Sequence, residues 1–225
     1  MCERFSLSSP LQEVSERFGI RQVRFAYTPR FNIAPTQPVS VIVPHKGERM
    51  LEEHRWGLVP FWGKDAVNAD SSAVHEKPAY RKLFAQQRCI IPSNGFYVWK
   101  TVKKKREPLR VVLKEGGLFG MAGLYEIWKD TRGKEYRTCT VMMTRANRLV
   151  FEYDERMPVI LDDAAMDDWL DPLRNGQTDF LQSLLQPYAP ERMRAYAVSP
   201  EVAGREELGA EDVEPVPGRM AWMKR

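Results

Sequence analysis

The opening stretch MCERF places a cysteine directly behind the initiator methionine. A start methionine is usually removed when the next side chain is small, and cysteine is small. The mature chain would then begin with a free α-amine and a thiol on adjacent carbons of Cys2, a pair that reacts with aldehydes. The alternative interpretation is that Cys2 is only a small residue near a chain end, without a chemical role.

Three asparagines and one acidic stretch are further candidates, because each lies beside a predicted loop. They are Asn32 in RFNIAPTQ, Asn68 in VNADSS, Asn94 in PSNGFYVW, and residues 151–158, FEYDERMP. Asparagine also favours turns for purely conformational reasons, and clustered carboxylates are typical of solvated turns. Residue type alone therefore leaves both the catalytic and the structural interpretation of these positions open.

The sequence predicts neither a metal site nor a bound cofactor. The chain has an odd number of cysteines, Cys2, Cys89 and Cys139, and none of them has CxxC spacing. This argues against a zinc site or a disulfide framework and fits a reducing compartment. The three histidines also lack the spacing of metal ligands. Glycine-rich phosphate loops and the common hydrolase motifs are absent from the sequence.

The charge and the hydropathy of the sequence limit which cellular compartment and which binding partners can be expected. The net charge of +4 and the pI near 8.9 permit contact with a polyanion without demonstrating it. The most basic stretch, KTVKKKREPLR (Lys100–Arg110), fits either a solvated hairpin tip or a contact with a phosphate backbone. Apolar runs stay well short of the roughly 20 residues that span a bilayer, and no signal-peptide pattern is present, so we expect a cytoplasmic protein without membrane contact.

The elements that must position the candidate residues are mainly strands. Ser9 and Pro10 predict the start of a helix that ends at Gly19, and residues 21–38, with three prolines, favour a loop. Asp162 or Asp163, and then Thr178, are predicted to cap two later helices. Strands are predicted within residues 39–44, 51–62, 88–100, 109–114, 118–128, 136–144, 157–161 and 194–198.

This order of elements predicts an α+β fold. Strands and helices do not alternate regularly, which argues against a doubly wound sheet. We expect a single domain over residues 1–200, with a curved, mostly antiparallel sheet flanked by helices. Residues 201–225 are polar and rich in proline and glycine, which favours a loosely packed tail.

Taken in order, several segments resemble one family, the SOS-response-associated peptidase (SRAP) proteins, which crosslink to abasic sites in single-stranded DNA. The resemblance covers about residues 1–200, and the order and spacing of its motifs make it specific. The matching segments are MCERF, RFNIAPTQ, WGLVPFW, the long block NADSSAVHEKPAYRKLFAQQRCIIPSNGFYVWK, and DERMPVIL.

The resemblance implies a barrel-like SRAP sheet and a role for each matching residue. After Met1 is removed, the amine of Cys2 attacks the aldehyde of an abasic site, and its thiol closes a thiazolidine ring. Asn68 would position the sugar or the amine, and Asp154 would be a partial substitute in proton transfer. Residues expected to hold single-stranded DNA are Arg4, Asn32, Trp62 and Arg81. We further expect a monomer that associates with the nucleoid when DNA is damaged.

The chain also departs from the family pattern. The family's general acid/base glutamate is Val98 here, and its histidine falls on Asp154. Asp70 replaces an arginine that resembles a phosphate contact, Ser72 replaces a glutamate, and Glu3 stands where glycine is usual. Loss of one positioned acid or base typically costs about 10²–10⁴-fold in rate, so we expect slower crosslinking or a changed substrate.

Three hypotheses about function remain open at this point. The first is covalent capture of abasic sites through Cys2. The second is a catalytically depleted relative that binds single-stranded or damaged DNA without bonding to it. The third is a self-processing peptidase that removes Met1 or a short leader.

Overall fold

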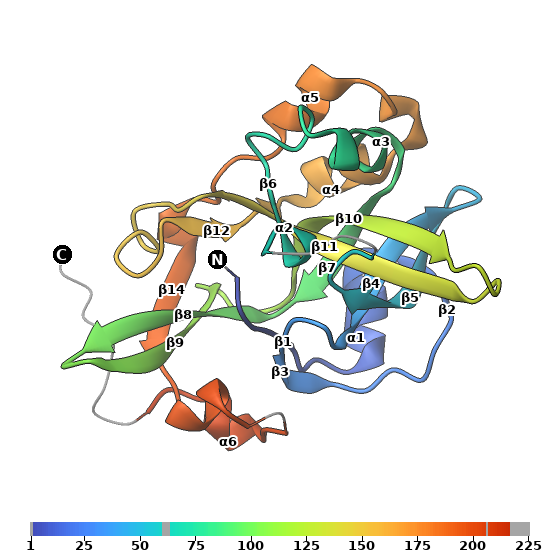
Figure 1. The fold of residues 1–225 in the computed structure, drawn as a ribbon. Helices are drawn as coiled ribbons and strands as arrows, with labels where there is room; N and C mark the ends of the chain where they lie inside the picture. Colours follow the sequence, from blue (N-terminus) through green and yellow to red (C-terminus); the bar gives the residue numbers. More distant parts are fainter. Residues whose placement is uncertain (1, 60–63, 206, 217–225) are drawn as a thin grey trace.

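The computed structural model describes residues 2–59, 64–205 and 207–216, and its strands form two sheets with helices packed around them (Figure 1). The smaller sheet has the order β14-β9-β8-β1-β3 and is antiparallel throughout. Its strands are β1 (Phe5–Leu7), β3 (Arg30–Ile33), β8 (Gly95–Val102), β9 (Lys105–Leu113) and β14 (Met193–Ala197).

The larger sheet closes into a barrel. The order β11-β10-β7-β4-β5 is antiparallel, and β5 then pairs in parallel with β11 at Thr138↔Arg55 and Cys139↔Trp56. The five barrel strands are β4 (Pro38–His45), β5 (Glu48–Trp56), β7 (Arg88–Ser93), β10 (Phe119–Lys129) and β11 (Glu135–Arg145). This closure confirms the predicted single α+β domain with a curved, mostly antiparallel, barrel-like sheet.

Short strands extend the barrel at its edges. Strand β2 (Ile20–Val23) lies beside β5, and β13 (Ile160–Leu161) pairs with β10. Strands β6 (Asn68–Asp70) and β12 (Arg156–Pro158) both pair with β11, β6 in parallel and β12 antiparallel. The candidate residue Asn68 is therefore held by the barrel itself.

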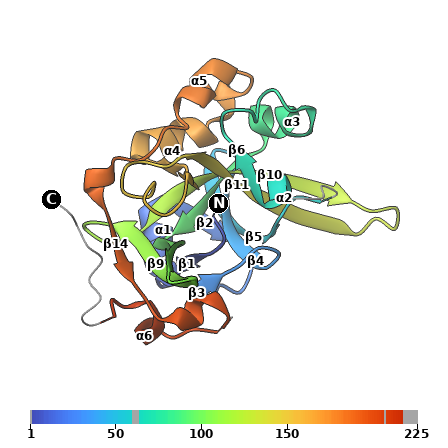
Figure 2. The same cartoon turned by 60° about the vertical axis from the view of Figure 1, so that its left-hand side comes forward.

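Helices cover the outside of the two sheets, as Figures 1 and 2 show from two directions. Helix α1 ends as predicted at Gly19, whose φ of 63° is the left-handed conformation that favours glycine. Asp162 caps α4 as predicted, whereas the cap of α5 is Gln177 rather than Thr178. The helices are α1 (Leu11–Phe18), α2 (Lys64–Val67), α3 (Pro78–Gln86), α4 (Asp163–Leu170), α5 (Thr178–Ser183) and α6 (Ala210–Val213), with short 3-10 turns at Pro172–Arg174, Pro190–Arg192 and Pro200–Ala203.

Two segments differ from the sequence-based expectation. Residues 21–38 were expected to form a loop, but they contain most of β2 and the whole of β3. These strands obtain their hydrogen bonds from the distant strands β5 and β1, so no local pattern indicated them. In the expected tail, Val202 and Val213 are buried in a cluster with Tyr97 and Val198, so the chain is anchored at these two residues, while most of the described residues around them are exposed.

Trp56 joins the beginning of the chain to the strand that carries Asn68. Its indole is fully buried, and its ring meets that of Phe5 edge-on with centroids 5.1 Å apart. Its Nε1–H donates to the carbonyl of Val67 at 2.8 Å. Both views show the beginning of the chain next to α2 and β6 (Figures 1 and 2). Within the described ranges, no helix is long and apolar enough to cross a membrane.

We predict that Trp56→Phe lowers the free energy of unfolding by about 2–4 kcal/mol. The smaller ring leaves a cavity in the core, and the carbonyl of Val67 loses its buried donor. Urea unfolding measures the change. Trp128→Phe is the control, because Trp128 lies on the β10–β11 hairpin against Tyr136 and is only half-buried. Equal destabilisation by the two variants would contradict the role given to Trp56.

Candidate active site

Cys2 and Asn68 lie together although 66 positions separate them in the chain. The side-chain amide of Asn68 donates from Nδ2 to the carbonyl oxygen of Cys2 at 2.9 Å. Asn68 begins β6, whose parallel pairing with β11 places it opposite Val141. Barrel strand β11 thus fixes Asn68, and Asn68 in turn holds the backbone of Cys2.

The side-chain oxygen of Asn68, Oδ1, lies in a different environment from the nitrogen Nδ2. Asn68 is 8% exposed, and its Oδ1 is buried without a hydrogen-bond partner among the described residues. A buried acceptor that lacks a partner costs about 1–3 kcal/mol. Because Nδ2 of the same amide holds Cys2, this oxygen lies beside Cys2 and can accept a proton donor there, such as an amine or a hydroxyl.

The Cys2 thiol is packed into the core. Cys2 is 3% exposed, and its Sγ lies 3.7 Å from the carbonyl oxygen of Arg4. Burial is the largest cause that raises the pKa of this thiol to about 12, and the charges of Asp154 and Glu3 act in the same direction. The sulfur is therefore protonated at neutral pH and must lose its proton during any reaction.

Asp154 and Val98, the two positions where the chain departs from the family pattern of acid/base residues, differ in their chemistry. Asp154 is near enough to influence the thiol, and its Oδ1 accepts from the backbone N–H of Arg156 at 3.0 Å. Val98, on β8, is 5% exposed and belongs to the same buried apolar cluster as Cys2. A carboxylate is therefore present on one side of the site, whereas Val98 offers no group that transfers a proton.

Asp70 and Arg156 form a bidentate ion pair next to Asn68. Arg156 Nη1 donates to Asp70 Oδ2 at 2.7 Å, and Nη2 lies 2.6 Å from Oδ1. Arg156 Nη2 also donates to the carbonyl of Met143, which lies on β11 between the two strands. The pair crosses β11 and ties β6, with Asn68, to the segment that carries Asp154.

Of the described residues predicted to hold DNA, Arg4 and Asn32 bind the same segment of the chain, whereas Arg81 lies on a separate helix. Asn32 is 1% exposed and donates from Nδ2 to the carbonyls of Val202 and Arg205, and Arg4 donates to the carbonyl of Ala203. Both side chains thus hold the chain after residue 200. Arg81 is exposed on α3. Trp62 lies outside the described residues.

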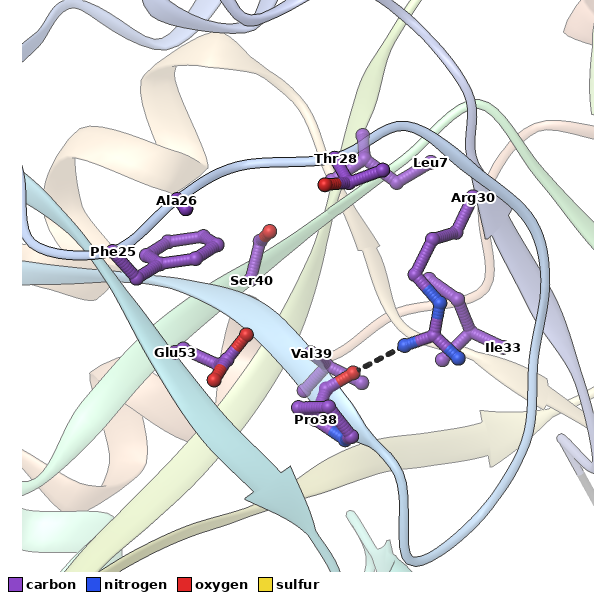
Figure 3. Close-up of a pocket in the computed structure, with 10 residues that line it drawn as sticks. All are labelled: Leu7, Phe25, Ala26, Thr28, Arg30, Ile33, Pro38, Val39, Ser40 and Glu53. Carbon is purple, nitrogen blue, oxygen red and sulfur yellow. Dashed lines mark hydrogen bonds between the residues drawn. The ribbon is translucent and has the colours of Figure 1, made fainter.

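A cavity of about 240 Å³ is lined by Leu7 of β1 and by residues of β3, β4 and β5 (Figure 3). Phe25, Ser40 and Glu53 point into it, and Arg30 donates across its edge to the carbonyl of Pro38 at 2.6 Å. None of the predicted catalytic residues lines this cavity. Groups of three or more metal-ligating side chains are also absent from the part of the chain that the structure describes.

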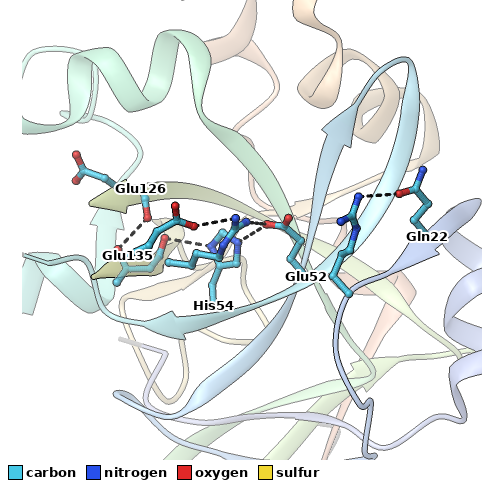
Figure 4. Close-up of polar contacts among 8 residues, drawn as sticks. Gln22, Glu52, His54, Glu126 and Glu135 are labelled. Atoms are coloured by element: carbon cyan, nitrogen blue, oxygen red, sulfur yellow. Dashed lines mark hydrogen bonds and ion pairs between the residues drawn. The ribbon is translucent and has the colours of Figure 1, made fainter. Parts of the chain in front are cut away.

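A buried charged network reinforces the barrel where β5 meets β11 (Figure 4). The Glu52 carboxylate accepts from His54 Nε2 at 2.9 Å and from Arg137 Nη1 at 2.6 Å. The hydrogen bond from His54, assisted by Arg137, lowers the pKa of Glu52 despite its burial. The network joins the strand of Trp56 to the strand that supports Asn68, and we assign it a structural role.

Comparison with known proteins identifies the family. The family described as SOS response associated peptidase (SRAP) matches residues 1–204. The chain belongs to the SRAP family. Abasic site processing protein YoqW of Bacillus subtilis (strain 168) is 42% identical over 208 residues, covering 88% of this chain and 92% of that protein. Abasic site processing protein HMCES of Xenopus tropicalis is 28% identical over 182 residues, covering 64% of this chain and 54% of that protein.

The SRAP fold is also seen in solved structures. A crystal structure of a protein from Bacteroides thetaiotaomicron superposes with a TM-score of 0.84 at 26% identity, covering 96% of this chain and all of that one. Within this SRAP protein, sequence reasoning missed Trp56 and Arg156 as residues that position the site. Opposite charges at Asp70 and Arg156, both within motif segments, were the available signal for their ion pair.

The Asp70–Arg156 pair predicts a specific dependence of stability on pH. Hydrogen bonds from Arg156 and Ser72 hold the pKa of Asp70 well below its usual range. The ionised carboxylate therefore stabilises the fold above about pH 4, and this contribution is lost as the pH falls further. Asp70→Asn should lower the free energy of unfolding at pH 6, with a smaller difference from wild type below pH 4.

Urea unfolding across this pH range measures the difference. Glu115→Gln removes an exposed carboxylate outside the site and is the control. A destabilisation by Asp70→Asn that stays constant down to the lowest pH would contradict the assignment.

Proposed function

We propose that this SRAP protein processes abasic sites in DNA by bonding to them through Cys2. The observation that carries the proposal is the 2.9 Å hydrogen bond from Asn68 to the carbonyl of Cys2, which holds a 1,2-aminothiol residue in one position. The names of the relatives from Bacillus subtilis and Xenopus tropicalis, which are abasic site processing proteins, support the same substrate. The partner is a single DNA strand, whose abasic sugar is accessible without opening a duplex.

The reaction takes place in two steps once Met1 has been removed. The neutral α-amine of Cys2 attacks the aldehyde carbon of the opened abasic sugar, and loss of one water gives an imine. The sulfur then adds to the imine carbon while the nitrogen gains a proton, which closes a five-membered thiazolidine. Because amine and thiol share one residue, the second step is intramolecular and gains a large proximity advantage.

Asn68 and Asp154 have separate roles in these steps. The unpaired Oδ1 of Asn68 accepts from the amine of Cys2 or from a sugar hydroxyl and so aligns the attack. The thiol is protonated at neutral pH, so the nearby Asp154 carboxylate accepts its proton as sulfur bonds to carbon. The burial of Cys2 in the apolar core excludes water that would hydrolyse the imine.

A non-covalent binding function is the second candidate. It is favoured by the 3% exposure of Cys2 and by valine at position 98, where the family has a proton-transferring glutamate. Under this hypothesis the chain holds single-stranded or damaged DNA and leaves the abasic sugar intact. Formation of a covalent adduct distinguishes the two functions directly.

We predict that wild-type protein incubated with an abasic single strand gives a shifted band on a denaturing gel, and that Cys2→Ala gives none. The substitution removes the sulfur that closes the ring, so an imine formed by the amine alone is hydrolysed. Cys89→Ala is the matched control, since Cys89 is a fully buried core cysteine on β7, and it should retain the adduct.

Intact mass of the same sample should show that Met1 is absent from the adduct-forming chain. Equal adduct from Cys2→Ala would exclude the thiazolidine mechanism. Absence of adduct from wild type whose Met1 has been removed would favour the non-covalent function instead.

We also predict that Asp154→Asn slows adduct formation by about 10²-fold while leaving the folded structure intact. An asparagine oxygen still accepts from the N–H of Arg156, but it cannot take the thiol proton. Single-turnover rates at saturating protein measure the effect, and Asp179→Asn on α5 is the control. An unchanged rate for Asp154→Asn would remove Asp154 from the mechanism.

A further inference from the structure

Most of the chain's excess positive charge is concentrated in one hairpin. Residues 100–107, which we name the basic hairpin, contain five basic side chains and one acidic one, Glu107, and so carry a net charge of +4. The whole chain of 225 residues also carries +4. The charges of the remaining sequence therefore sum to zero, and the net charge of the chain equals that of this one element.

The basic hairpin is built to expose its charges. It joins β8 to β9 through a tight turn in which Lys103 and Lys104 adopt φ values of 46° and 67°, the pattern of a type I′ turn. Its lysines and Arg106 are exposed, and the hairpin projects away from the barrel (Figure 1). Turns of this type favour Asn-Gly, so two lysines in the left-handed conformation are retained at a conformational cost.

One ion pair joins this hairpin to the residue after Cys2, and a ring contact within the hairpin orients the same arginine. Arg106 Nη2 lies 3.0 Å from a carboxylate oxygen of Glu3, the residue that follows Cys2. The Arg106 guanidinium also stacks over the ring of Trp99, 4.8 Å from its centroid. Glu3 and Arg106 are 45% and 58% exposed, so the ion pair is accessible from solvent.

We propose that the basic hairpin binds the phosphate backbone of the DNA strand next to the abasic site, and that Glu3 occupies Arg106 until a phosphate replaces it. This proposal rests on the proposed function, because it supplies the backbone contact for the strand that reaches Cys2. Exposed lysines bind phosphates through counterion release, which requires no base sequence. An arginine held by an aromatic ring and a carboxylate is already oriented to receive a bidentate phosphate.

The same observations favour DNA over an anionic membrane as the partner of the basic hairpin. An anionic membrane would also attract the lysines, but the hairpin lacks the exposed apolar face that inserts into a bilayer. A single strand bonded at Cys2 necessarily passes near Glu3, and hence near Arg106. The position of Arg106 near the start of the chain therefore favours DNA as the partner of the basic hairpin.

The test is the salt dependence of binding to an intact thymine oligonucleotide, measured by fluorescence anisotropy. The variant Lys103→Asn/Lys104→Gly/Lys105→Gln removes three charges and installs the residue pair that the turn prefers, so folding is preserved. We expect affinity at about 100 mM salt to fall about 10- to 100-fold, and the slope of log K against log salt to decrease by about 2. Lys46→Gln/Lys114→Gln/Lys134→Gln removes the same charge from three exposed lysines elsewhere and should have little effect.

Glu3→Gln tests whether Glu3 competes with phosphate for Arg106, and here the expected change is a gain in affinity. Without the carboxylate, Arg106 is available to a phosphate, so affinity should rise about two- to fivefold and the slope should steepen by about 0.7. Weaker binding by Glu3→Gln would overturn the competition between Glu3 and phosphate. An equal loss of affinity in the two triple variants, or none in the hairpin variant, would overturn the role of the hairpin.

Further measurements separate this proposal from the proposed function. At protein concentrations well below saturation, the hairpin variant should form abasic-site adduct more slowly than wild type, because fewer strands are held beside Cys2. Hairpin-dependent binding of intact DNA without any adduct from wild type would support the hairpin and reject covalent capture. Binding to phosphatidylserine vesicles that depends on the hairpin, while DNA binding does not, would assign the surface to a membrane instead.

Discussion

The position of Cys2 depends on the buried Trp56. Its ring packs against Phe5, three residues after Cys2, and its N–H bonds the carbonyl of Val67, one residue before Asn68. One rigid side chain thus sets the distance between the chain start and the strand β6, and the Asn68–Cys2 hydrogen bond completes the arrangement. Trp56 lies where β5 and β11 close the barrel, so the stability of the whole barrel is transmitted to an otherwise short N-terminal segment.

Burial and reactivity oppose each other at Cys2. Core packing orients the thiol and, in the proposed reaction, keeps water away from the imine, but it also stabilises the protonated sulfur and raises its pKa. A site of this kind needs a nearby proton acceptor, and Asp154 lies near enough to influence the thiol. Because Val98 cannot transfer a proton, the proposed mechanism depends on the carboxylate of Asp154.

Charge is distributed unevenly around this site. Arg156, next to Asn68, is neutralised by Asp70 in a bidentate pair that serves to join β6 to β12. Positive charge is concentrated instead on the β8–β9 hairpin, whose Arg106 contacts Glu3. The acidic substitutions at positions 3 and 70 therefore each engage an arginine, and we infer that DNA is attracted mainly by the hairpin rather than by the immediate surroundings of Asn68.

The sequence by itself determined the fold class, the helix ended by Gly19, most barrel strands, the family, and Cys2 and Asn68 as candidates. These features depend on local residue preferences and on the order of motifs, both of which can be read directly from the sequence. Only the tertiary structure decided that β2 and β3 are strands, that residues 202–205 are held by Asn32 and Arg4, and that Asp70 pairs with Arg156. Each of these contacts joins residues far apart in the sequence, and its energy arises only when the closed barrel brings the partners together.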